Sequence, residues 1–177
     1  SADGAGGLTV NGNGILTLAA ANNHTGPTTV TNGILRVNNS LGLQYSTLLM
    51  SNVVGGVAFN TGVASMTLAG LGGFGDLTMT NQNGTALALT LGSAGSSTYS
   101  GCLRSTAQVT KAGAGTQTFT GTNLYTGNTT INAGTLALSG VGSISNSSIV
   151  TVNAGATFDV SGVTAGYALW NGQILRG

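Results

Sequence analysis

The sequence predicts an all-β protein in which short strands stack as a β-solenoid, and three observations lead to this expectation. Short segments of alternating polarity recur along the chain, an internal duplication returns after 101 residues, and only 4% of the residues are charged. Alternation places one set of side chains inward and the other outward, as in half-buried strands. A duplication of this length is typical of architectures built from stacked, similar units.

The alternating segments provide the expected strands in chain order, and Asn-Gly pairs between them provide the expected turns. The strand segments are residues 8–10, 15–18, 28–30, 34–37, 66–68, 77–79, 86–91, 135–138, 149–152 and 157–160. The turn pairs begin at Asn11, Asn13, Asn32, Asn83 and Asn171. No segment has a convincing helical period. The Ala19–Ala21 run aligns with Thr120-Gly121-Thr122, which are poor helix formers, and we therefore expect strand and turn there.

The duplication aligns residues 12–37 with residues 113–138 without a gap, and ten of these 26 positions are identical. Looser similarity continues beyond the aligned core. We therefore expect one β-solenoid domain over residues 1–177, with diverged repeats at about 12–62 and 113–162 joined by a spacer. Many short strands also occur in β-sandwiches, but the duplication and the missing edge charges favour the solenoid. At roughly 20–25 residues a turn, about 7–8 turns fit, and a rise of about 4.8 Å each gives a rod of about 35–40 Å.

Residues 111–136 (KAGAGTQTFTGTNLYTGNTTINAGTL) closely resemble the autotransporter-associated β-strand repeat. The matching residues are Lys111, Gly113, Gly115, Thr116, Thr118, Thr120, Gly121, Asn123, Tyr125, Thr126, Gly127, Thr129, Thr130, Asn132, Gly134, Thr135 and Leu136. The first copy departs from the pattern, because His24 stands where Tyr is expected and Pro27 is unusual. The resemblance implies a right-handed parallel β-helix, exported to a bacterial surface. It carries over no catalytic residue.

The scarcity of charge excludes several classes of partner. Four scattered cations cannot neutralise a run of phosphates, which argues against nucleic acid, and no basic cluster is present to attract anionic membranes. No apolar run approaches the length that spans a bilayer. With a net charge of +1, little repulsion separates copies of the chain, and we expect self-association. The chain begins at Ser1 without Met, and we expect a processed product that is ordered to its ends.

The residues that could carry chemistry are few, and the sequence predicts no catalytic, cofactor-binding or metal site. His24 aligns with Tyr125, which indicates an aromatic packing or turn position. Asp76 and Asp159 are the only Asp residues inside the repeat body, and such isolated residues argue against the acid pair of a polysaccharide-cleaving β-helix; Asp159 is expected to face solvent. One Cys and one His build no metal site.

Three further features have structural explanations. Cys102 is expected to be buried as a small hydrophobic residue, although an intersubunit disulfide is the alternative. The Gly70–Gly75 run (GLGGFG) has the wrong spacing for a dinucleotide fingerprint and is expected to be a turn. The larger aromatic residues would form a carbohydrate platform only if they aligned outward, and we expect them in the core or in turns. They are Tyr45, Tyr99, Tyr125, Tyr167 and Trp170.

These observations predict an extracellular, non-enzymatic structural protein at a bacterial surface. Both ends of the sequence read as ordinary turns without a cap, and a head-to-tail contact between such ends does not close, so it gives a filament. The leading hypothesis is therefore a self-assembling fibre subunit whose partner is another copy of itself. The alternatives are a passenger segment of an adhesin, with cell-surface or matrix glycans as partners, and, less favoured, a polysaccharide-active enzyme.

Overall fold

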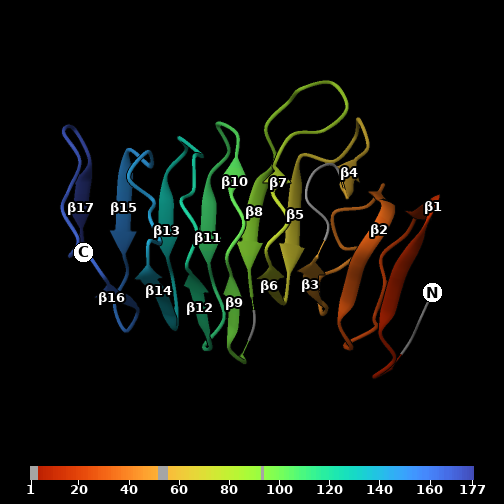
Figure 1. Ribbon diagram of the computed structural model, residues 1–177, viewed down its shortest axis with the longest axis horizontal. Helices are drawn as coiled ribbons and strands as arrows, with labels where there is room; N and C mark the ends of the chain where they lie inside the picture. The colour runs from red at the N-terminus through yellow and green to blue at the C-terminus, as the bar shows by residue number, and fades with distance from the viewer. Residues whose placement is uncertain (1–3, 52–55, 93) are drawn as a thin grey trace.

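In the computed structural model, the chain forms a rod of stacked strands with its two termini at opposite ends (Figure 1). The structure describes residues 4–51, 56–92 and 94–177, and the expected order at Ser1 therefore concerns a residue outside the described part. These residues form strands and no helix. The strands are β1 (Leu8–Leu18), β2 (Thr28–Val37), β3 (Thr47–Met50), β4 (Val57–Phe59), β5 (Ser65–Leu68), β6 (Gly70–Gly73), β7 (Leu77–Thr78), β8 (Ala88–Leu91), β9 (Ser97–Tyr99), β10 (Leu103–Arg104), β11 (Val109–Lys111), β12 (Thr116–Phe119), β13 (Thr129–Ile131), β14 (Thr135–Gly140), β15 (Ile149–Val152), β16 (Thr157–Val163) and β17 (Ile174–Arg176).

The strands stack in parallel along the rod, which confirms the predicted β-solenoid, with about eight turns. A nine-stranded sheet has the order β1-β2-β3-β6-β9-β12-β14-β16, with β4 also paired to β2. A six-stranded sheet has the order β5-β8-β11-β13-β15-β17, and β7 pairs with β10 in a third, two-stranded sheet. Neighbours in each sheet come from successive turns, so each turn hydrogen-bonds to the turns before and after it.

The core lies inside the coil and is built by the alternation that the sequence shows. In β13, Thr129 and Ile131 are buried, whereas Thr130 between them faces outward. Inward residues stack in columns along the rod axis, and one column in the six-stranded sheet pairs Leu89 with Val109 and Val109 with Thr129. The stacking removes apolar side chains from water turn by turn, which is the main stabilising contribution.

The prediction of a turn over the Gly70–Gly75 run is wrong for its first four residues, which form strand β6. Glycine is required there because neighbouring turns approach closely. A Cβ atom on Gly70 would lie 2.6 Å from Ser97 Oγ, and one on Gly73 would lie 2.1 Å from the Met50 carbonyl oxygen. Gly73 also has φ of +84°, a conformation that L residues rarely adopt. Close packing, not chain reversal, explains this glycine run.

The two repeats occupy different faces of the solenoid. Thr28 pairs with Leu48 in the nine-stranded sheet, whereas its equivalent Thr129 pairs with Val150 in the six-stranded sheet. The turns between the copies differ in length: 20 residues separate Thr28 from its partner Leu48 (48 − 28), but 26 separate Gly73 from Tyr99 (99 − 73). The offset of 101 residues is therefore not a whole number of turns, and the second copy is rotated about the axis.

Candidate functional site

The two repeats build the same buried hydrogen-bond network, which fastens one turn to the next. In the second copy, Tyr125 Oη lies 2.6 Å from Thr129 Oγ1, and Thr129 Oγ1 lies 2.9 Å from Ser147 Oγ. Ser147 Oγ donates to the Gly127 carbonyl oxygen at 2.9 Å. Burial raises the pKa of Tyr125, so its hydroxyl stays protonated and available to this network.

His24 takes the place of this tyrosine in the first copy, as the alignment predicts. Its Nε2 lies 2.9 Å from Thr28 Oγ1, which is 2.8 Å from Ser46 Oγ, and Ser46 Oγ donates to Gly26 O at 2.7 Å. The ring is 2% exposed, and its Nδ1 is a buried atom with no hydrogen-bond partner. The sequence predicted no role for Ser46 or Ser147, although the similarity between the two copies extends to both.

An asparagine lies beside each network and shows how the two copies differ. Asn123 Nδ2 donates to Gly121 O and Ser143 O, and its Oδ1 accepts the Leu103 amide of the preceding turn at 3.0 Å. The equivalent Asn22 makes the corresponding donations, but within the described part of the chain its Oδ1 accepts no hydrogen bond. The first turn thus presents an unused acceptor at the N-terminal end of the rod.

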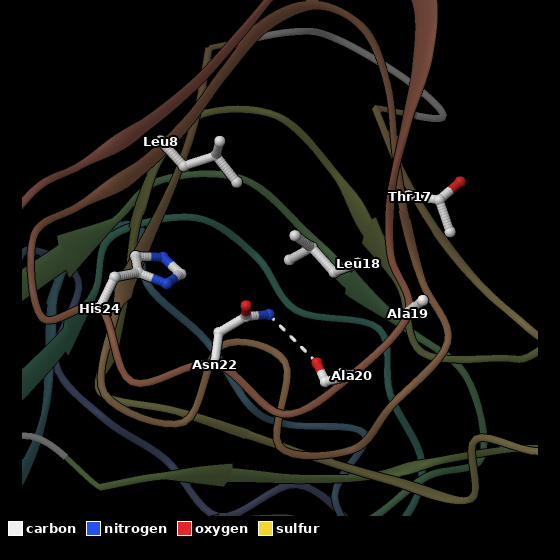
Figure 2. Close-up of a pocket in the computed structure, with 7 residues that line it drawn as sticks. All are labelled: Leu8, Thr17, Leu18, Ala19, Ala20, Asn22 and His24. Carbon is white, nitrogen blue, oxygen red and sulfur yellow. Dashed lines mark hydrogen bonds between the residues drawn. The ribbon is translucent and has the colours of Figure 1, made fainter. Parts of the chain in front are cut away.

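A cavity of about 350 Å³ opens at this N-terminal end (Figure 2). Figure 2 shows Leu8, Leu18 and His24 arranged around it, with Asn22 bonded to Ala20 below. Its full lining is Leu8, Thr17, Leu18, Ala19, Ala20, Asn22 and His24. In the second copy, a preceding solenoid turn covers the equivalent residues, and Tyr99 packs edge-on against Phe119 with ring centroids 6.2 Å apart. The cavity is therefore the open inner surface of a solenoid turn.

The C-terminal end is open as well. Val152, Phe158, Val160, Tyr167 and Leu175 line a cavity of about 320 Å³ together with the last two residues. The Phe158 and Tyr167 rings pack edge to face at 5.4 Å, and Leu175 is 45% exposed. Each end of the rod therefore presents apolar side chains that would belong to the core if another turn covered them.

Lys111 is the unexpected buried charge. It points into the coil between Leu91 and Ile131 of the adjacent turns, and its Nζ donates to the carbonyl oxygens of Gly113 and Ala133. Burial lowers the pKa of this amine. Through these two hydrogen bonds, Lys111 links Gly113 of its own turn to Ala133 of the next turn. The charge of Lys111 alone did not predict this role.

The two side-chain carboxylates in the described part of the chain, Asp76 and Asp159, bind separate partners and do not pair with each other. Asp76 forms an ion pair with Arg104 at 2.9 Å and accepts the Cys102 amide at 3.0 Å. Asp159 accepts the amide and hydroxyl of Ser161, and these hydrogen bonds hold the pKa of Asp159 below its usual value. The described residues include no group of three His, Cys, Asp or Glu side chains that could hold a metal ion.

Cys102 and the aromatic residues lie mainly where the sequence placed them. Cys102 is buried, as predicted, and burial raises the pKa of its thiol. Tyr99 and Tyr125 are fully buried, whereas Tyr45 and Trp170 are exposed. The aromatic residues therefore do not form one continuous outward platform.

A family model matches the chain at the two repeats described above. The family model described as Passenger-associated-transport-repeat matches residues 8–37 and 109–138, which contain the His24–Thr28 and Tyr125–Thr129 contacts of the two networks. This match confirms the resemblance to the autotransporter passenger repeat, and the family implies a secreted or surface-exposed protein. Searches of curated proteins and of solved structures find no match. No helix in the described part of the chain is long and apolar enough to cross a membrane.

Proposed function

We propose that this chain, which carries two passenger-associated-transport repeats, is a structural rod at a bacterial surface that assembles end to end into a fibre. The observation that carries the proposal is the pair of open ends. Among the described strands, β1 at the N-terminal end pairs only with β2, and at the C-terminal end β16 pairs only with β14 and β17 only with β15. Each end thus has free strand edges around an apolar surface.

Two such ends are complementary as consecutive turns of one solenoid. The C-terminal end contributes Phe158 and Leu175, and the N-terminal end contributes Leu8 and Leu18 around its cavity. Pairing of the free edges would satisfy their backbone groups, and the contact would bury both apolar surfaces. Gly4 forms an isolated parallel bridge with His24 at the N-terminal end, and we expect this bridge to open when a second copy docks. The near-absence of charge leaves little repulsion against this contact.

The interior network supports a scaffold without catalysis. Hydroxyl and amide groups inside the coil are engaged in fastening turns, and Asp76 and Asp159 have separate partners. We propose no enzymatic activity for this segment.

A passenger segment of an adhesin is the second candidate, and exposed aromatic residues favour it. Tyr45 is 53% exposed, Phe74 is 56% exposed and Trp170 is 68% exposed. Because Tyr and Trp rings combine an apolar face with a polar tip, they suit binding to surface or matrix glycans.

Negative-stain electron microscopy of the chain over a dilution series tests the fibre. We expect unbranched filaments with an axial repeat of about 38 Å, from eight turns at about 4.8 Å each. Leu18→Lys places a charge on the N-terminal end and should prevent filaments, whereas Gln108→Lys on an exposed loop should not. Short rods of the wild type at every concentration would refute the fibre. Glycan-array binding that is lost in Trp170→Ala would then favour the adhesin.

A further inference from the structure

The outward face of the six-stranded sheet presents an unbroken column of threonines. Register pairs join Thr67 to Thr90, Thr90 to Thr110, Thr110 to Thr130, and Thr130 to Thr151. All five are half-buried and alternate with inward core residues, so their side chains stand on the outer surface. Figure 1 shows the strands that carry them, β5, β8, β11, β13 and β15, side by side along the rod.

The hydroxyls of this column are available to a ligand. Within the described part of the chain, the hydroxyls of Thr67, Thr90, Thr110 and Thr130 form no hydrogen bond, and that of Thr151 accepts one from Arg176 Nε at 3.1 Å. The inward Thr28 and Thr129 hydroxyls, in contrast, are fully engaged in the turn networks. Four of the five outward hydroxyls therefore form no hydrogen bond between turns, and only that of Thr151 links its turn to the next.

The column is more regular than the repeat sequence requires. Thr67, Thr90 and Thr151 lie outside the segments that match the family model. Pairing along the six-stranded sheet proceeds without a register shift, whereas the nine-stranded sheet has irregularities between β1 and β2 and between β14 and β16. No Asp, Glu, Lys or Arg faces outward in the described strands β5, β8, β11, β13 and β15, and the column ends at Arg176 of β17, which pairs with Thr151.

We propose that this threonine column binds the surface of ice crystals. Each threonine presents a hydroxyl, which can form a hydrogen bond with a water molecule. It also presents a methyl group, beside which the neighbouring water stays ordered. The parallel register repeats this pair every ~4.8 Å, close to the repeat of equivalent oxygen atoms along one axis of hexagonal ice. Apart from Arg176, which lies beside Thr151 at the C-terminal end of the face, the column carries no charge, and this matches a ligand that is itself uncharged and hydrogen-bonding.

The size of the face argues against a protein partner. Four steps of about 4.8 Å give a column about 19 Å long. A single column of this length offers far less surface than the roughly 800 Å² that each partner buries in a stable protein interface. A crystal surface needs no such area, because its repeat continues beyond the column and many molecules adsorb side by side.

The test is inhibition of ice recrystallisation by the purified chain, together with the shape of single ice crystals in a nanolitre osmometer. The wild type should slow grain growth and facet the crystals. Thr110→Lys and, as an independent second variant, Thr90→Lys should abolish both effects, because a long charged side chain lifts the flat face from the ice. Circular dichroism and thermal melting confirm the fold of each variant.

Thr118→Lys is the matched control, since Thr118 is also half-buried and outward but lies in β12 of the nine-stranded sheet. It adds the same charge and should keep full ice activity. Absence of ice shaping by the wild type would overturn the proposal, as would an equal loss of activity in Thr118→Lys. Saturable binding of the wild type to a crystalline polysaccharide, without any effect on ice, would assign the face to a different ligand.

Discussion

Gln117→Leu should destabilise the rod strongly, because the Gln117 amide replaces a stretch of missing strand pairing. Strands β6 and β9 pair only at Gly73 and Tyr99. Beside that pair, the buried Gln117 Oε1 accepts the Leu71 amide at 3.1 Å, and its Nε2 donates to the Leu71 carbonyl oxygen at 2.9 Å. Ser97 Oγ donates to the same Oε1 at 2.7 Å. The side chain thus bonds to Leu71 much as a neighbouring strand would.

Leucine is similar in size but satisfies none of these groups. It leaves the buried amide and carbonyl of Leu71 unpaired, and each unpaired group costs about 1–3 kcal/mol, so we expect a loss of about 2–6 kcal/mol in the free energy of unfolding. Urea denaturation followed by far-UV circular dichroism measures it. Gln108→Leu, at an exposed position, is the control and should change stability by less than about 0.5 kcal/mol. Equal midpoints for the two variants would refute the structural role of Gln117.

Three further predictions concern single positions. Gly73→Ala should lower the free energy of unfolding, measured by urea denaturation, by more than about 3 kcal/mol, because its φ is positive and a Cβ would meet the backbone of the neighbouring turn. Gly166→Ala is the control, since Gly166 also has a positive φ but open space around it, and it should cost about 1–2 kcal/mol. Similar losses in the two variants would contradict the close approach of the turns at Gly73. Tyr125→Phe should lower the free energy of unfolding by about 1–2 kcal/mol, because it removes a buried hydrogen bond. Tyr45→Phe, at an exposed position, should leave stability unchanged. If neither variant changes stability, the network does not stabilise the rod. Because the folded-state pKa of Asp159 is lowered, its contribution to stability is present above its unfolded pKa and is lost as the pH falls through the folded pKa. Asp159→Asn should therefore weaken the acid dependence of the melting temperature, and an unchanged profile would argue against its hydrogen bonds to the chain.

The architecture could be predicted from the sequence because the alternation that marks a solenoid strand lies within a few consecutive residues. Alternation located eight of the seventeen described strands, and the duplication related His24 to Tyr125 before their networks were visible. The glycine run failed because composition cannot distinguish a turn from a strand that lies too close to its neighbours for side chains. Gly70 and Gly73 need small size for packing, and only the spatial arrangement shows which backbone they meet.

The rotation of one repeat relative to the other could not be predicted from the sequence, for a different reason. It depends on the summed lengths of the intervening turns, and these range from the 20 residues between Thr28 and Leu48 (48 − 28) to the 26 between Gly73 and Tyr99 (99 − 73). The threonine column depends on the same register and could not be recognised from spacing, because its members recur at unequal intervals.

The polar groups of this chain divide into two sets, and the division determines what the molecule can do. Inside the coil, the hydroxyls of Thr28 and Thr129 and the amide of Gln117 replace or reinforce backbone pairing. Removing them should weaken the rod without touching its surface. Outside, the hydroxyls of Thr67, Thr90, Thr110 and Thr130 on the six-stranded sheet form no hydrogen bond, and the outermost strands have one unpaired edge, both within the described residues. Since the interior groups hold the turns together, any contact with another molecule must use the outer face or the ends. These two surfaces can be altered independently, because Thr110→Lys leaves both ends unchanged and Leu18→Lys leaves the threonine column unchanged.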